Sequence, residues 1–249
     1  MKIKLAPLLN ADSLLDVSPF SEFDIQVREQ FFPLTQGLYH QSLLVEESPQ
    51  IYLQQYYGLG TDDIKNYQLG YCNRQLGKQL PHHRSHDGVK LRGALSHLKI
   101  LRPSGHESFR GCITVPVYYE GEIVAYYGER IDRARRGSSA SYWHPIEKPA
   151  IFNIDHIENM PCVFMCQSPL VAIQMMDAFS SKVIATDASY NLCDEDLQCL
   201  ADKGVQSVIA VKHSNVDRLT LMKLAKRLSR FGIQYNSITH AHGGSYGRA

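Results

Sequence analysis

The segment CVFMCQSPLVAIQMMDAF, residues 162–179, joins a β-like apolar run to an apolar run with helical spacing through a turn at Gln167 and Ser168. A turn between a strand and a helix is a common position for the functional groups of α/β proteins. This turn carries an amide and a hydroxyl, and no acid, base or metal ligand. It is therefore either an active-site turn of an unusual kind or one that has lost its chemistry.

Other residues keep a metal site open as an alternative. Asp187 follows a predicted strand and Asp217 opens a predicted helix, so relocated carboxylates could hold Mg²⁺ or Mn²⁺. His82, His83 and His86 fall in one polar stretch, PHHRSHDG, which could bind a transition metal but more simply forms a solvated loop. We predict no metal site as the primary interpretation.

The elements that would position these groups alternate regularly from residue 162 onward. Ser168 and Pro169 suit the start of a first helix, Asp194 suits the cap of a second, and Gly204 and Gly232 suit the ends of the second and third. The alternation predicts right-handed βαβ crossovers and a parallel sheet. The predicted strands are 162–166, 182–186, 207–212 and 233–238, and the predicted helices are 169–179, 195–203 and 216–231.

The first part of the chain has an α+β pattern. The run YLQQYYGLGTDDIKNYQLGYC predicts a helix, a glycine turn, a second helix capped by Thr61 and an extended exit. The run GCITVPVYYEGEIVAYYGERI predicts a β-hairpin with Glu120 and Gly121 at its turn. The predicted organisation is an N-terminal extension (1–44), an α+β subdomain (45–155), a βαβ domain (156–240) and a disordered tail (241–249).

Composition and charge exclude some classes of protein. The chain has 249 residues and is 44% hydrophobic, but no apolar run approaches the ~18–20 residues of a membrane span. Asp12 and Asp16 interrupt a signal-like start, so we expect a cytoplasmic protein whose six cysteines are reduced. Residues 71–140 hold 12 basic and 6 acidic side chains, an excess that suggests a surface facing a polyanion.

Three segments, in this order, resemble the catalytic core of bacterial-type DNA primases. They are residues 52–72, with the YL…GL turn and LGY exit; residues 107–131, with the FR…G…YGER hairpin; and residues 140–153, ASYWHPIEKPAIFN. The βαβ half then falls where that family has its TOPRIM domain. The resemblance covers roughly residues 45–240 and does not include the family's N-terminal zinc-binding module.

The resemblance implies metal-dependent primer synthesis, because TOPRIM domains hold Mg²⁺ or Mn²⁺ on a Glu after the first strand and an Asp-x-Asp pair after the third. In this sequence the Glu position is Gln167, the Gly that usually follows it is Ser168, and the two Asp positions are Lys212 and Ser214. Hard divalent cations need anionic oxygen ligands, which an amide and an ammonium cannot replace. We therefore predict a degenerate TOPRIM turn without catalytic residues and without a metal cofactor.

The resemblance also implies a basic groove for the template strand. Arg110 and Arg130 match basic positions of the hairpin motif, and the loop DRARR follows directly. Alternation along the hairpin places Tyr118 and Tyr126 on one face and Tyr119 and Tyr127 on the other. One set is expected to pack in the core, and the exposed set beside this zone could stack on single-stranded bases; core packing alone is the alternative. The predicted nucleic-acid-binding residues are Arg110, Arg130, Arg133, Arg135, Arg136 and Tyr127.

Three functions stay open at this point. We favour a non-catalytic primase-like protein that binds single-stranded nucleic acid, serves replication or a mobile genetic element, and could have a replication or mobility protein as partner. An active nucleotidyltransferase or nuclease would have to use the relocated carboxylates. A module for protein–protein contacts would keep the parallel sheet only as a scaffold.

Overall fold

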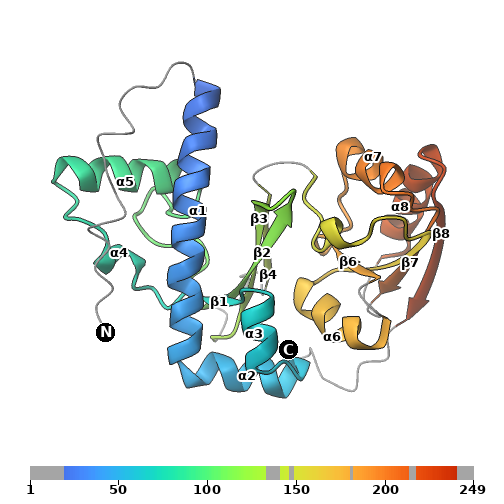
Figure 1. Cartoon of the computed structure of the whole chain (residues 1–249), viewed down its shortest axis with the longest axis horizontal. Helices are drawn as coiled ribbons and strands as arrows, with labels where there is room; N and C mark the ends of the chain where they lie inside the picture. Colours follow the sequence, from blue (N-terminus) through green and yellow to red (C-terminus); the bar gives the residue numbers. More distant parts are fainter. Residues whose placement is uncertain (1–19, 133–140, 146–148, 180–181, 213–216, 240–249) are drawn as a thin grey trace.

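The computed structural model describes residues 20–132, 141–145, 149–179, 182–212 and 217–239. Two subdomains follow one another along the chain (Figure 1). The first is built around a four-stranded antiparallel sheet, and the second around a four-stranded parallel sheet. This mixed α/β architecture confirms the predicted fold class.

The antiparallel sheet has the order β1-β2-β3-β4. Its central hairpin turns at Glu120 and Gly121, whose φ angles of 53° and 83° are the left-handed conformation that a tight hairpin turn needs. The predicted hairpin is therefore confirmed. The elements of this subdomain are α1 (Phe20–Val45), α2 (Glu47–Tyr57), α3 (Thr61–Asn66), β1 (Gly70–Tyr71), α4 (Leu76–Gln79), α5 (His86–His97), β2 (Cys112–Tyr119), β3 (Glu122–Arg130) and β4 (Ser141–Pro145).

Both faces of this sheet are covered. On one face Tyr126 packs edge-to-face on Phe32 of α1, with ring centroids 5.4 Å apart, and its hydroxyl donates to the Phe32 carbonyl at 3.2 Å. Phe31 is buried beside them. The long helix α1 fills most of the stretch set apart as an N-terminal extension, and it contributes to the core of the first subdomain. The alternate residue, Tyr127, faces the opposite core.

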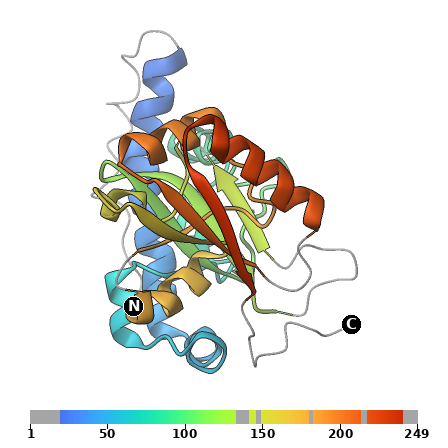
Figure 2. The same cartoon turned by 90° about the vertical axis from the view of Figure 1, so that its right-hand side faces the viewer.

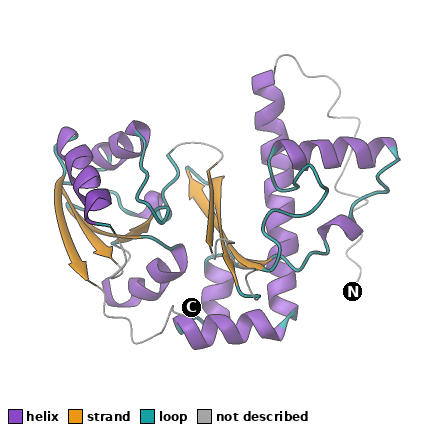
Figure 3. Cartoon of the chain, turned by 180° about the vertical axis from the view of Figure 1, so that it is seen from behind, coloured by secondary structure: helices purple, strands orange, loops and turns teal. Residues whose placement is uncertain are grey.

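The parallel sheet has the order β6-β5-β7-β8. All three strand pairings are parallel, as the βαβ pattern predicts. α6 covers one face, and α7 and α8 cover the other, as the views from the front and from behind agree (Figures 1 and 3). The elements are the 3₁₀ turn η2 (Ile154–His156), β5 (Cys162–Cys166), α6 (Pro169–Phe179), β6 (Val183–Ala185), α7 (Asp194–Asp202), β7 (Ser207–Lys212), α8 (Arg218–Arg230) and β8 (Gln234–Thr239).

Two helices begin one residue away from the predicted cap. α7 starts at Asp194 itself, and Cys193 is the N-cap, whose N–H donates to the Asp196 carboxylate at 2.8 Å. Thr61 is likewise the first residue of α3, which is capped by Gly60. In both helices the acidic residue at the third position accepts from the cap N–H, and this bond fixes the start of the helix.

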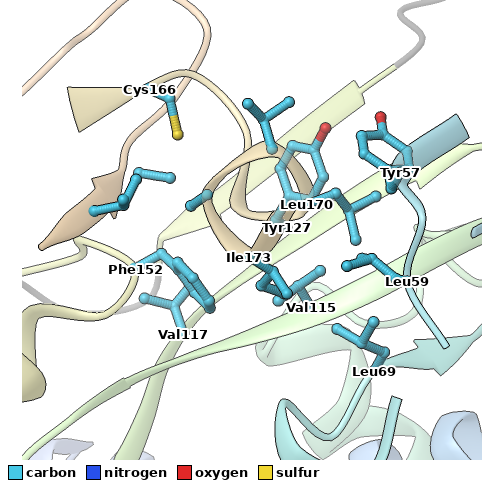
Figure 4. Close-up of a cluster of buried hydrophobic side chains, with 14 of the residues drawn as sticks. Tyr57, Leu59, Leu69, Val115, Val117, Tyr127, Phe152, Cys166, Leu170 and Ile173 are labelled. Carbon is cyan, nitrogen blue, oxygen red and sulfur yellow. The ribbon is translucent and has the colours of Figure 1, made fainter. Parts of the chain in front are cut away.

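The two subdomains share one hydrophobic core (Figure 4). Val115 and Val117, on the hairpin face that points away from α1, pack against Leu170 and Ile173 of α6. The sheet face left open by α1 is therefore closed by a helix that begins at the Gln167–Ser168 turn. Among the described helices, none combines the length and the apolar character that crossing a bilayer requires.

Candidate functional site

The turn after β5 lies at the carboxyl edge of the parallel sheet, where α/β proteins place ligands. β5 and β7 are neighbours, with Met165 opposite Ala210, so Gln167 is level with Lys212 at this edge. The Gln167 amide N–H donates to the carbonyl oxygen of Ala188 in the loop after β6. The amide thus supplies a donor that a carboxylate at this position would lack.

The same edge contains the carboxylate of Asp187. Its Oδ1 accepts the backbone N–H groups of Ser189 at 3.1 Å and Asn191 at 2.7 Å, so it shapes the loop after β6. Asp217 is the exposed N-cap of α8. The side chain of Lys212 and all of Ser214 lie outside the described residues. Within the described part of the chain, no group of three His, Cys, Asp or Glu side chains is arranged to hold a metal ion.

Ser168 links the turn to a buried network, which we call the Glu129 network. The Ser168 hydroxyl donates to the Tyr127 oxygen at 3.1 Å, and the Tyr127 hydroxyl donates to the Glu129 carboxylate at 2.7 Å. Tyr52 donates to the same carboxylate at 2.8 Å, and Tyr57 donates to it as well. Glu129 is 7% exposed, so three phenols rather than water solvate its charge.

This network corrects the predicted role of Tyr127. Its side chain is only 4% exposed and lies in the shared core, beneath α6 (Figure 4). A base cannot stack on a ring that is covered on this face by another helix. The predicted alternation of the hairpin tyrosines was right, but the expectation that one set is exposed was wrong, because helices cover both faces.

The end of the hairpin away from its Glu120–Gly121 turn carries a charged cluster, which we call the arginine cluster. The Asp132 carboxylate pairs with the Nε of Arg130 and with the Nη2 of Arg74. Arg74 stays 46% exposed, and Arg130 20%. Arg110 lies two residues before Cys112, the cross-strand partner of Arg130, and is therefore at the same end of the sheet.

The electrostatics of the arginine cluster favour full ionisation. Partial burial alone would raise the pKa of Asp132, but the guanidinium groups of Arg130 and Arg74 outweigh it and hold this pKa below its ordinary value. The hydrogen bond to Asp132 raises the pKa of Arg130, and Tyr142 also bonds to this arginine. Within the arginine cluster itself, the three guanidinium groups of Arg74, Arg110 and Arg130 outnumber the one carboxylate of Asp132; Glu46 and Glu129 are further carboxylates at this end of the sheet.

Backbone geometry sets Asp132 beside Arg74. Gly111, at the entrance to β2, has a φ of 72°, and a Cβ added there would lie 2.7 Å from Asp132 Oδ2 and 3.1 Å from Arg74 Nη2. Its N–H donates to the Cys72 carbonyl at 2.9 Å, and its carbonyl accepts from Ile131 at 3.1 Å. A side chain at this position would separate the ion pair.

The structure describes only part of the predicted nucleic-acid-binding set. Arg110 and Arg130 are at one end of the sheet, whereas Arg133, Arg135 and Arg136 lie outside the described residues. Sequence reasoning missed Arg74 and Asp132, because 58 residues separate them and no local pattern indicates their pairing.

The histidine stretch forms the approach to α5. The His82 and His83 rings stack with centroids 4.3 Å apart, and His86 begins the helix, with its Nδ1 3.6 Å from Asp87. All three histidines are exposed, as expected for a solvated polar loop.

No family model matches the sequence, and no curated protein matches it either. Solved structures do match. The zinc-binding and RNA polymerase domains of the Aquifex aeolicus primase align with 95% of this chain at 15% identity, with a TM-score of 0.68. The DnaG primase catalytic domain bound to single-stranded DNA aligns with 90% at 13% identity and a TM-score of 0.69. The chain has the fold of the bacterial primase catalytic core.

The Escherichia coli primase catalytic core matches as well, at 15% identity over 88% of this chain, with a TM-score of 0.66. These alignments confirm the predicted primase-like arrangement of an α+β subdomain and a TOPRIM-like parallel sheet. The chain spans 58% of the length of the Aquifex primase structure, 76% of the DNA-bound domain and 72% of the E. coli core. At this identity the likeness concerns the fold.

Proposed function

We propose that this primase-like protein binds single-stranded nucleic acid through the arginine cluster and does not synthesise primers at the TOPRIM-like edge. The observation that carries the proposal is the pairing of Arg74 and Arg130 on Asp132. Two guanidinium groups held by one carboxylate are already oriented, so less side-chain entropy is lost when they bind a phosphate.

The chemistry of the cluster suits a phosphate backbone. Arginine presents a planar fork of donors that matches phosphate oxygens in pairs. The side chain of Arg110 forms no ion pair or hydrogen bond with any other described residue, and it is partly exposed. Tyr142, partly exposed and bonded to Arg130, is the aromatic side chain placed to contact a base. It takes the role that the sequence assigned to Tyr127.

The absence of primer synthesis is proposed from the groups at the TOPRIM-like edge. Gln167 presents an amide that donates to Ala188, and Asp187 is engaged by two backbone N–H groups. Mg²⁺ and Mn²⁺ would require anionic oxygens free to coordinate. Several solved primase structures with this fold are bound to single-stranded or double-stranded DNA, and this supports nucleic-acid binding by analogy.

Fluorescence anisotropy of labelled single-stranded DNA tests the binding. We expect wild type to bind with an affinity that falls with salt, because arginine displaces counterions from phosphates. Arg110→Ala/Arg130→Ala should weaken binding and reduce the slope of log K against log salt by about 1.4, or ~0.7 for each lost contact. Lys65→Ala/Lys78→Ala, which removes two exposed cations elsewhere in the first subdomain, is the matched control.

Two results would overturn the proposal. Binding that is absent, or that falls equally in the control, would remove the arginine cluster as the nucleic-acid interface. Primer synthesis dependent on Mg²⁺ or Mn²⁺, and lost in Asp187→Ala or Asp217→Ala, would establish the relocated catalytic site instead.

A further inference from the structure

The solvent face of α8 carries a combined apolar and basic surface, which we call the basic ridge. The ridge consists of five side chains: Leu219 (55% exposed), Met222 (59% exposed), Lys223, Lys226 and Arg230. At 3.6 residues per turn, these five fall within an arc of about 100° around the helix axis, opposite the buried Leu221, Leu224 and Leu228. Within the described part of the chain, none of the three cations forms an ion pair.

The neighbouring helix α7 presents the opposite charge. A pocket of ≈ 590 Å³, which we call the acidic pocket, lies along it. Glu195 and Asp202 line the pocket without a cationic partner among the described residues, and Gln198 donates to Asp202 at 2.7 Å. The one lysine in the lining, Lys203, forms an ion pair with Glu158, with its Nζ 3.7 Å from Glu158 Oε1. The pocket therefore keeps a negative excess.

Helices α8 and α7, which carry the ridge and the pocket lining, lie side by side on one face of the parallel sheet (Figures 1 and 2). Arg227 of α8 pairs with Asp194 of α7 at 2.9 Å. The two helices are both crossovers between parallel strands, so they run in the same direction. A two-fold axis along the groove between them places α8 of one copy over α7 of the other, twice.

We propose that this face joins two copies of the chain, with the basic ridge of each copy in the acidic pocket of the other. The arrangement is closed, because the same two surfaces meet their complements on both sides of the axis. It also brings Leu219 and Met222, near the start of α8, against the other copy, so exposed apolar area is buried together with the opposite charges.

The small area of this face predicts a weak dimer. α8 has 13 residues, a length of about 20 Å at ~1.5 Å per residue, and two adjacent helices make a face about 20 Å wide. Such a dimer buries about 800 Å² in total, which is below the range of stable complexes. We therefore expect an association that depends on concentration and weakens with salt, because salt screens the contacts between opposite charges.

Sedimentation velocity over a concentration series, at low and at high salt, tests the proposal. The full chain should shift toward twice its 28.2 kDa mass at low salt. Lys223→Glu/Lys226→Glu opposes two acidic surfaces, and Glu195→Lys/Asp202→Lys opposes two basic ones, so each variant alone should dimerise at least about tenfold more weakly. Mixed together, the two variants should restore the dimer, because each ridge then meets a pocket of opposite charge.

Circular dichroism establishes that each variant is folded, and Lys65→Glu/Lys78→Glu serves as a control with the same charge change on the other subdomain. Recovery in the mixture but not in the separate variants establishes the two-fold contact. A chain that is monomeric at every concentration overturns it. So does a ridge variant that leaves the dimer intact but loses affinity for single-stranded DNA, since that result assigns the ridge to nucleic acid. Loss of DNA binding through Arg110 and Arg130 is measured separately and leaves the dimer test unaffected.

Discussion

Replacing Glu129 should destabilise the protein far more than replacing an exposed acid of the same strand. Glu129 is 7% exposed, and three tyrosine hydroxyls donate to its carboxylate. A hydrogen bond to a charged group contributes about 1.5–3 kcal/mol, and removing one side of a buried charged network leaves its partners unsatisfied at a cost of about 3–5 kcal/mol. We therefore expect Glu129→Ala to lower the free energy of unfolding by about 3–5 kcal/mol.

Urea denaturation followed by circular dichroism and by the fluorescence of the single tryptophan, Trp143, measures this loss. Glu122→Ala, an exposed position of the same strand, is the control and should change stability by less than about 0.5 kcal/mol. Glu129→Gln keeps the shape and one acceptor oxygen, and its cost should fall between the two. A loss below about 1 kcal/mol for Glu129→Ala would refute the network as a stabilising element of the first subdomain.

Three further substitutions test individual contacts. Gln167→Glu should cost about 1–2 kcal/mol at pH 7, because a carboxylate cannot donate to the Ala188 carbonyl, and the loss should shrink below about pH 4, where the protonated acid can donate. The folded pKa of Asp132 is lowered, so its stabilisation is present above the unfolded pKa and is lost as pH falls through the folded one. The stability difference from Asp132→Asn, about 1 kcal/mol, should therefore be constant above about pH 5 and vanish in acid titrations. Gly111→Ala should destabilise more than Gly121→Ala in urea and weaken DNA binding, since both have positive φ but only Gly111 has neighbours within 3 Å of an added Cβ.

The βαβ half was predictable because its signals are local. The strand predicted at 207–212 coincides with β7, and the helix predicted at 169–179 coincides with α6, because β-branched runs and Ser-Pro and Gly punctuation mark them directly. The observed N-caps lie one residue before the predicted ones in the two helices where the acid at the third position accepts from the N–H of the cap residue. Such cap bonds depend on geometry that composition does not specify.

The candidate site was less predictable because its contacts are distant in sequence. Alternation along the hairpin correctly separated Tyr126 from Tyr127, but only the packing of α6 across the sheet shows that both are buried. The partner of Arg130 was two residues away, whereas Arg74 reaches Asp132 across 58 residues. A single sequence contains the charges of the cluster without indicating which of them meet.

The Gln167–Ser168 turn has donors where the resemblance predicts an acid and a glycine. The Gln167 amide donates to the Ala188 carbonyl, and the Ser168 hydroxyl donates to the Tyr127 oxygen. The Tyr127 hydroxyl in turn donates to the buried Glu129 carboxylate. A carboxylate at position 167 would face that carbonyl oxygen and repel it, and a glycine at 168 would leave Tyr127 without one of its bonds. A carboxylate placed at position 167 alone would therefore remove a hydrogen bond within the parallel-sheet subdomain before it could offer a ligand to a metal ion, while Ser168 joins this turn to the first subdomain through Tyr127.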